Sequence, residues 1–481
     1  MRVPSAAVLA AALAVAGPAR SRAAHAQTAA PPAPAAPPVA SPVLARGTAP
    51  RVVALENGMQ VIVVENHAVP LATAKLVVRT GAMTQTPDDQ GIPHLFEHML
   101  FKGYRGPGDR TFGQLASELR AGYNGTTSEE LVTYYLSGPS EAVPDAVRLL
   151  AGLVRDARFE PEDLRTERFV VLGEMERDRS DPRDLLRRKI GRALWGDGWY
   201  RKNTIGEATA LLGVSPARLR AIYGRYYVPN NAALVVTGDV AAERVVEAAR
   251  RHFGPWRRGA DPFAGAPVSD PPPLAESRVV VVPAAVDAVT LLVEWQGPSV
   301  VTARADTYAA DVLAAVVDDE RSPMAGRLVD SGNFQSAQFG YETLAHTGPL
   351  VFSGTTTMDR LASALTALAA ECDIMSAPDY FDAPALADAA KRRRVAAALE
   401  AEAGPSLAHT IGNWWAVAGL DYHLGYDDAL AAQTPGDLRR FVRRYVTRKA
   451  FVVGAVVPQG REDETRVMLE QFVAMAKEAQ P

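Results

Sequence analysis

The sequence predicts an α+β protein of two homologous halves, each an α/β sandwich in which helices back a mixed or antiparallel sheet. Three observations support this fold class. Alternating apolar segments separated by turn residues open the folded part, helical sequence follows them, and a helix–strand unit recurs in the second half. The 481 residues are 48% hydrophobic and 22% charged, which is enough for a large core.

Charge and cysteine content exclude several classes of function. The formal net charge is −4 and the isoelectric point is near 6.1, so the balance indicates neither nucleic acid nor an anionic membrane as a partner. Cys372 is the single cysteine, which excludes an intramolecular disulfide. No segment after the N-terminal region is long and apolar enough to span a membrane.

The N-terminal 26 residues have the pattern of a secretory signal peptide. A basic start at Arg2 precedes an apolar stretch over 3–17 and the small-residue pattern Ala24-His25-Ala26, which predicts cleavage after Ala26. Residues 27–49 are rich in Ala and Pro and predict an extended linker. We therefore expect a periplasmic or secreted protein.

The first folded elements are strands. Apolar alternation predicts strands at 52–54, 60–65 and 71–80, and Asn57-Gly58 between the first two is a strong hairpin signal. Helical sequence begins near Gly91.

A second Pro-rich segment, 259–276, separates a first half at 50–258 from a second half at 277–470. Ser215-Pro216 is followed by Arg-Tyr and an apolar strand segment, and the same order recurs at Thr434-Pro435, 219 residues later. In both places Ser or Thr followed by Pro is a sound start for a helix. The repeat indicates a duplication, although helix–strand units also share composition without common origin.

The most informative motif is His94-Leu95-Phe96-Glu97-His98. On a helix, positions i, i+3 and i+4 lie on one face, so the two imidazoles and the carboxylate are neighbours. Two neutral imidazoles suit a dication such as zinc, and a carboxylate beside them can accept a proton from water. This is the H-x-x-E-H order of inverzincin peptidases. The alternative is an ordinary amphipathic helix that carries two histidines.

Catalytic zinc usually has three protein ligands, so a third is needed. A helix is predicted from Pro161 to about Asp178, and it carries Glu167 and Glu174. These residues are two helical turns apart and face the same way, so one can bind the metal while the other supports the site. Glutamates on a helix are otherwise usually solvated.

Four segments in order resemble the signatures of the pitrilysin and insulinase-type peptidases, the family that includes mitochondrial processing peptidase. The resemblance implies one Zn²⁺ per chain on His94, His98 and Glu174, with Glu97 as general base and Glu167 as a supporting carboxylate. It also implies that the chain forms half of a clamshell. Pro93 departs from the small residue usual at its position, but proline is tolerated in the first turn of a helix. The four segments are GIPHLFEHMLFKG (91–103), GYNGTTS (122–128), ERFVVLGE (167–174) and YVPNN (227–231).

The resemblance also assigns Asn124. In this family the segment leads into an edge strand to which substrate peptide adds as a further strand, so Asn124 would bind substrate backbone. Without the resemblance, Tyr123-Asn124-Gly125 predicts a simple turn.

Active members of the family also use an arginine and a tyrosine, with six residues between them, from another half-chain. From residue 277 onward no Arg is followed seven positions later by Tyr, and the nearest spacing is Phe334 to Tyr341. In some bacterial relatives one polypeptide carries the zinc site and a second polypeptide carries the Arg/Tyr pair. We therefore expect a zinc metalloendopeptidase subunit that forms a heterodimer with an Arg/Tyr-bearing homologue and cleaves short or unfolded peptides in an enclosed chamber. A homodimer is the other assembly, and a non-catalytic structural or peptide-binding relative is the other function.

Overall fold

The computed structural model describes residues 49–265, 267–402 and 404–478. The expected signal peptide at 1–26 lies outside the described residues, as does the linker at 27–49 up to residue 48. Among the described residues, none of the helices has the length and apolar character needed to cross a membrane.

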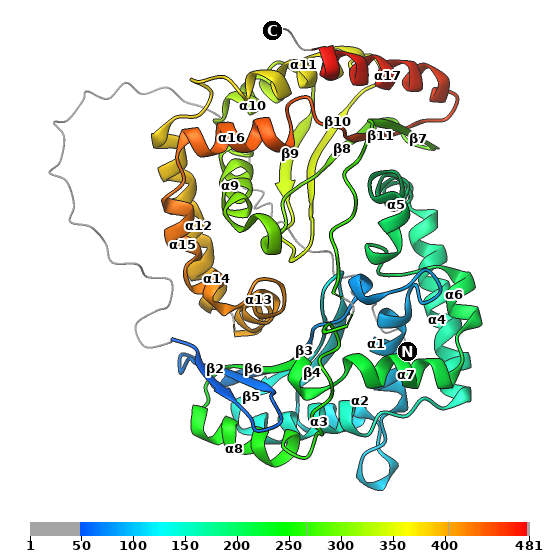
Figure 1. The fold of residues 1–481 in the computed structure, drawn as a ribbon, viewed down its shortest axis with the longest axis vertical. Helices are drawn as coiled ribbons and strands as arrows, with labels where there is room; N and C mark the ends of the chain where they lie inside the picture. Colours follow the sequence, from blue (N-terminus) through cyan, green and yellow to red (C-terminus); the bar gives the residue numbers. More distant parts are fainter. Residues whose placement is uncertain (1–48, 266, 403, 479–481) are drawn as a thin grey trace, which may run out of the picture. The chain divides into compact units, whose positions relative to one another are not determined.

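The first sheet has six strands in the order β1-β2-β6-β3-β5-β4 (Figure 1). The predicted strands at 52–54, 60–65 and 71–80 are confirmed to within two residues at each end. Only β2 and β6 pair in parallel, so the sheet is mixed. The strands are β1 (Arg51–Ala54), β2 (Gln60–Glu65), β3 (Leu71–Val78), β4 (Gly122–Thr127), β5 (Val132–Pro139) and β6 (Ala232–Gly238).

Helices of the first half cover one face of this sheet. Side chains alternate across a strand, so Ala74, Leu76 and Val78 of β3 enter a core with α1, α3 and α8. The helices of the first half, not all of which contact this sheet, are α1 (Ile92–Gly103), α2 (Phe112–Glu118), α3 (Val143–Arg155), α4 (Pro161–Ser180), α5 (Pro182–Trp195), α6 (Ala208–Gly213), α7 (Pro216–Tyr226) and α8 (Ala242–Phe253).

The second sheet has the order β7-β11-β8-β10-β9, and β7 pairs with β11 in parallel. The order and directions match β2-β6-β3-β5-β4, so the two sheets share one topology. The strands are β7 (Arg278–Ala284), β8 (Val289–Gln296), β9 (Ser336–Tyr341), β10 (Pro349–Thr356) and β11 (Val452–Pro458). The helices are α9 (Val300–Val317), α10 (Pro323–Ala325), α11 (Leu361–Ile374), α12 (Ala383–Glu402), α13 (Gly404–Val417), α14 (Leu420–Leu424), α15 (Tyr426–Ala431), α16 (Pro435–Tyr445) and α17 (Glu462–Glu478).

The repeated helix–strand unit occupies equivalent places in the two halves. Ser215 caps α7 by accepting a hydrogen bond from the backbone amide of Arg218, and Thr434 caps α16 in the same way from Asp437. The two helices lead into β6 and β11, which hold corresponding positions in their sheets. The predicted fold class of two similar α/β halves is confirmed.

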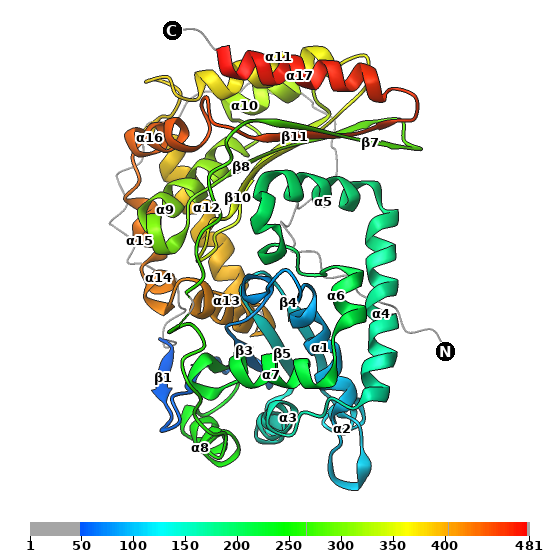
Figure 2. The ribbon, with the colours of Figure 1, turned by 45° about the vertical axis from the view of Figure 1, so that its right-hand side comes forward.

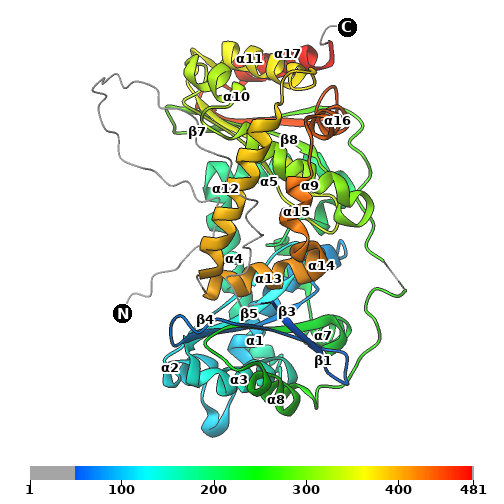
Figure 3. The ribbon, with the colours of Figure 1, turned by 90° about the vertical axis from the view of Figure 1, so that its left-hand side faces the viewer.

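Each half contributes a helix to the other half's sheet (Figures 1, 2 and 3). Leu407, Ile411 and Trp415 of α13 pack against Ile62 of β2 and its neighbours on the second face of the first sheet. In return, α5 packs Leu186, Ile190 and Leu194 against Val282, Leu292, Val452 and Val456 of the second sheet. Burying each large apolar side chain contributes about 1.5–3 kcal/mol, so the exchange joins the halves firmly.

Candidate metal centre and active site

Helix α1 presents the H-x-x-E-H motif beside the core. Its N-cap, Gly91, has φ 89°, and a Cβ at this position would lie 2.7 Å from the backbone oxygen of Ile205, so a glycine is required there. Leu95, Phe96 and Met99 are buried below the helix, whereas the two histidines and Glu97 are only partly buried. The burial of these three apolar side chains therefore determines which face of α1 carries the histidines and Glu97.

Helix α4 brings the two glutamates to the same place. It spans Pro161–Ser180, and Leu164, Val171 and Met175 bury one side of it. Glu167 is 8% exposed, and Glu174 lies two turns further along. Both glutamates contact His98, although they are far from it in sequence.

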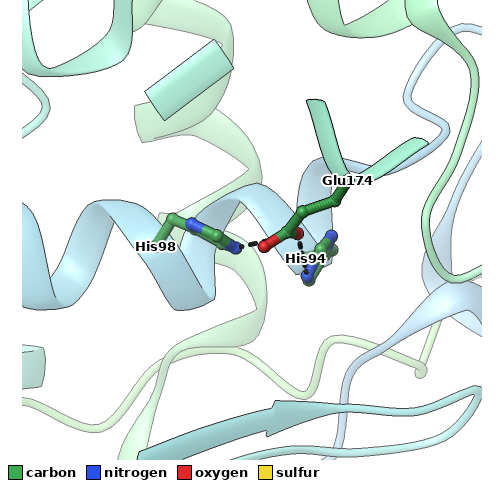
Figure 4. A group of neighbouring side chains, drawn as sticks. All are labelled: His94, His98 and Glu174. Carbon is green, nitrogen blue, oxygen red and sulfur yellow. Dashed lines mark ion pairs between the residues drawn. The ribbon is translucent and has the colours of Figure 1, made fainter. Parts of the chain in front are cut away.

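His94, His98 and Glu174 form a group that could hold a metal ion, with one ligand atom from each residue and all three atoms within 4.8 Å of one another. Figure 4 shows the Glu174 carboxylate between the two rings. Its Oε2 lies 3.7 Å from Nε2 of His94 and 3.6 Å from Nε2 of His98. Two ligand atoms on a tetrahedral zinc ion are about 3.4 Å apart. The nitrogen and oxygen donors and their spacing therefore fit zinc.

Glu167 contacts the opposite side of the His98 ring. Its Oε2 lies 3.3 Å from Nδ1 of His98, so the N–H at Nδ1 donates to the carboxylate and Nε2 faces Glu174. Lys102, one turn after His98 on α1, places its ammonium 3.6 Å from Glu167 Oε1. Glu167 thus orients the ring, and Lys102 partly balances the charge of Glu167.

The two carboxylates beside His98 favour a positive charge in the centre, which a proton on His98 supplies when no metal is bound. Burial alone would lower the pKa of His98, but its contacts with Glu167 and Glu174 raise that pKa to about 9. Burial and the neighbouring His98 lower the pKa of His94 to about 4. The hydrogen bond from His98 lowers the pKa of Glu174, which keeps this carboxylate ionised.

Glu97 projects toward strand β4. The hydroxyl of Thr127 donates a 2.8 Å hydrogen bond to Oε2 of Glu97, and burial raises the pKa of this carboxyl group. β4 passes so close that a Cβ on Gly125 would lie 2.7 Å from Cγ of Glu97. Glu97, His98, Asn124 and Glu167 line one cavity of about 500 Å³. The structure therefore brings these four predicted residues together, and His94 and Glu174 contact His98 directly.

The segment around Asn124 is a strand. Residues 122–127 form β4, which is the edge of the first sheet, so the prediction of a simple turn is wrong. A peptide could add to the free edge of β4 beside Glu97, because an edge strand has unpaired backbone groups. Asn124 lines the cavity next to Glu97, and its substrate role stays a prediction.

The fourth signature, YVPNN, contributes packing. The hydroxyl groups of Tyr227 and Tyr134 are 2.8 Å apart, and the Tyr227 ring packs edge-on against Phe96 of α1. The Asn231 side chain donates to the backbone oxygens of Arg79 and Tyr226. The Tyr227 ring therefore packs against α1, and Asn231 links the end of β3 to the end of α7.

Sequence reasoning assigned no role to Thr127, Gly125 or Lys102. Thr127 and Gly125 lie in the second signature, close to Asn124 in sequence. This closeness was the signal that could have indicated a role for them in the site. Lys102 follows His98 by one helical turn, which places it on the same face. In the second half, Phe334 is buried in the core, and Tyr341 donates its hydroxyl to the backbone oxygen of Pro298.

Two family models match the chain. Residues 60–207 match the model described as insulinase, peptidase family M16, and residues 213–375 match the peptidase M16 inactive domain. An uncharacterized zinc protease of Rickettsia felis is 27% identical over 208 residues, which are 43% of this chain and 50% of that protein. An uncharacterized zinc protease of Mycobacterium tuberculosis is 30% identical over 210 residues, which are 44% of this chain and 48% of that protein. The matched region thus spans about half the length of these relatives.

Solved structures show the same fold. A protease from Helicobacter pylori has a TM-score of 0.76 at 19% identity, with 85% of this chain and 100% of that chain covered. The periplasmic protease PqqL from Escherichia coli has a TM-score of 0.72 at 16% identity, with 89% of this chain and 50% of that chain covered. The two-half fold of this chain is therefore that of these solved structures. The chain belongs to the pitrilysin and insulinase-type peptidase family, M16.

Proposed function

We propose that this chain is the zinc-bearing subunit of a periplasmic metalloendopeptidase that cleaves short or unfolded peptides in an enclosed chamber. The observation that carries the proposal is the convergence of His94, His98 and Glu174 beside Glu97 and the free edge of β4. The expected signal peptide supports the periplasmic location.

In the proposed mechanism, His94, His98 and Glu174 hold one zinc ion, and Glu167 fixes the ring of His98. When bound there, zinc would supply a Lewis acid for the peptide carbonyl and for the attacking water. Glu97 accepts a proton from the attacking water and returns it to the leaving amine. Asn124 and the edge of β4 hold the substrate as an added strand, which explains the preference for peptides without structure of their own.

The chain carries no Arg/Tyr pair in its second half. Charge that develops on the carbonyl oxygen needs further donors, and loss of one donor typically costs on the order of a hundredfold in rate. This chain matches half of the length of PqqL, and the solved first half of PqqL has a TM-score of 0.71 to it. We therefore propose a heterodimer in which a homologous subunit supplies the arginine and tyrosine.

The zinc-loaded chain alone should cleave an internally quenched unstructured peptide at least about a hundredfold more slowly, per zinc, than the complex with an Arg/Tyr-bearing homologue. Chelation should abolish the activity of the complex, and added zinc should restore it. Zinc content and initial rates measured on the same samples check both statements.

Full activity in the pure, partner-free chain would contradict the heterodimer and leave the zinc peptidase intact. A zinc-loaded complex that cleaves no peptide would instead favour a non-catalytic peptide-binding subunit. A partner variant that lacks its arginine is the matched control, since the complex should assemble without gaining activity.

Thr127→Val should lower kcat roughly tenfold with little change in KM or zinc content. Valine has the shape of threonine but lacks the hydroxyl that donates to Glu97 and orients it. Thr127→Ser retains the donor and should restore most of the rate. Steady-state kinetics and metal analysis of both variants check the prediction. A loss of rate in the serine variant and none in the valine variant would show that the methyl packing matters rather than the hydrogen bond.

A further inference from the structure

The connection between β4 and β5 carries a buried carboxylate that contacts the second half of the chain. Glu130, in this connection, is 2% exposed. Its Oε2 accepts a 2.7 Å hydrogen bond from the backbone amide of Ala345, and its Oε1 accepts a 2.9 Å hydrogen bond from that of His346. Hydrogen bonds to an ionised group are stronger than neutral ones. One side chain of the first half therefore holds two backbone groups of the second.

The two donors belong to the connection between β9 and β10, which is itself anchored. The backbone oxygens of Leu344 and Ala345 accept hydrogen bonds of 3.0 and 3.1 Å from the amides of Val300 and Val301 at the start of α9. In the shared topology β9 and β10 correspond to β4 and β5. Corresponding connections of the two halves thus meet at Glu130, and the one in the second half is tied to a helix.

The neighbours of Glu130 contact the second half as well. The ammonium of Lys202 donates 2.7 Å hydrogen bonds to Oε2 of Glu129 and to the backbone oxygen of Thr347, and the Lys202 side chain is 6% exposed. Leu131 is buried in the apolar cluster that α13 forms on the first sheet. Three consecutive residues of the β4–β5 connection therefore engage the other half of the chain.

The same connection continues directly from the catalytic strand. A 2.9 Å hydrogen bond from the amide of Ser128 to the backbone oxygen of Leu131 closes it, and the backbone amides of residues 82–83 hold it from the first half. Thr127, the residue before Ser128, donates its hydroxyl to Glu97. β5 pairs with one edge of β4, and the other edge is free. The position of Thr127 and of this free edge therefore depends on where the connection is held.

We propose that Glu130, with Lys202, is a positioning residue through which the second half fixes β4, and with it both the Thr127 hydroxyl and the edge that receives the peptide. The proposal rests on the peptidase function proposed above. It gives the second half a part in catalysis that needs neither a metal ligand nor an arginine. The buried carboxylate acts through the strand that it holds.

The test is the kinetics of Glu130→Gln in the zinc-loaded complex. Glutamine keeps the shape, but its NH₂ group cannot accept a hydrogen bond, so the variant loses one backbone link and the charge of the other. We expect kcat to fall about tenfold and KM to rise about threefold, at unchanged zinc content. Lys202→Met should change both parameters in the same direction, with kcat about threefold lower.

The split between kcat and KM identifies the route. Thr127→Val should change kcat alone, so a higher KM in Glu130→Gln reports a displaced strand edge. The double variant Thr127→Val/Glu130→Gln should have a kcat close to that of the slower single variant, because both changes remove the same orienting hydroxyl. Losses in kcat that multiply in the double variant would overturn the route through Thr127.

Thr237→Val is the matched control, because it breaks another hydrogen bond between the halves. The buried hydroxyl of Thr237 on β6 donates to the backbone oxygen of Gly404 at the start of α13, 2.7 Å away. This variant should lower Tm as Glu130→Gln does and leave kcat and KM unchanged. Equal losses of rate in both variants at equal Tm would show a general effect of stability and overturn the proposal, as would wild-type kcat and KM in Glu130→Gln and Lys202→Met.

Hydrogen exchange of the chain without substrate gives a readout that does not depend on catalysis. Amides of residues 122–131 should exchange faster in Glu130→Gln than in the wild type or in Thr237→Val, since β4 is held less firmly. Unchanged exchange there would overturn the positioning role even if the complex cleaves peptides. A wild-type complex that cleaves no peptide would refute the peptidase function, and faster exchange in Glu130→Gln would still support the link to β4.

Discussion

His98→Ala should leave the purified chain with almost no bound zinc and no peptidase activity. The variant loses the Nε2 atom that lies 3.6 Å from Glu174, and it also removes the ring that Glu167 orients. Loss of a supporting group around a metal typically weakens binding 10- to 100-fold, so loss of a ligand itself should exceed about a hundredfold. Metal analysis after dialysis against a weak chelator measures the effect.

Two glutamine variants should show graded losses of zinc affinity for comparison with His98→Ala. Glu174→Gln should weaken zinc binding nearly as much as His98→Ala, because a neutral amide replaces the charged ligand. Glu167→Gln should weaken it about 10- to 100-fold, since it acts through the His98 ring. His67→Ala is the matched control, because His67 is exposed and, among the residues that the structure describes, its ion pairs are with Glu65 and Asp239. Zinc content in His98→Ala equal to that of the wild type would rule out the proposed centre.

Glu97→Gln should retain zinc and lower kcat by about 10²- to 10⁴-fold. Glutamine keeps the shape and can still accept the hydrogen bond from Thr127, but it cannot take up the proton from water. The variant therefore separates the general base from the metal ligands. Single-turnover cleavage of the quenched peptide and metal analysis of the same preparation give the two readouts.

Glu176→Gln is the charge-matched control for this variant. Glu176 is exposed on α4, two residues after Glu174, so its loss should change neither zinc content nor kcat. Peptide cleavage by Glu97→Gln at the wild-type rate would refute the assigned role of Glu97. Loss of zinc from Glu97→Gln would mean that this carboxylate helps to hold the metal.

The sequence by itself determined the features that depend on local periodicity. The i, i+3 and i+4 spacing put His94, Glu97 and His98 on one face of α1, and the seven-residue spacing put Glu167 and Glu174 on one side of α4. The strand alternation and the helix caps likewise located β2, α7 and α16. Such patterns express backbone geometry and so are visible without the fold.

Only the tertiary structure decided which groups meet across the chain. It distinguishes Glu174, near the Nε2 atoms of both histidines, from Glu167, at Nδ1 of His98. Sequence spacing alone left these two glutamates equivalent. The structure also makes residues 122–127 an edge strand rather than a turn, because β5 pairs with one side of the segment. That pairing brings the Thr127 hydroxyl to Glu97, 30 residues away in sequence.

The exchange of α5 and α13 between the sheets was equally hidden from the sequence. A helix with an apolar face must bury it, but its sequence does not say against which sheet. Contacts of this kind depend on how distant segments pack, whereas the face of α1 that carries His94, Glu97 and His98 depends on five consecutive residues.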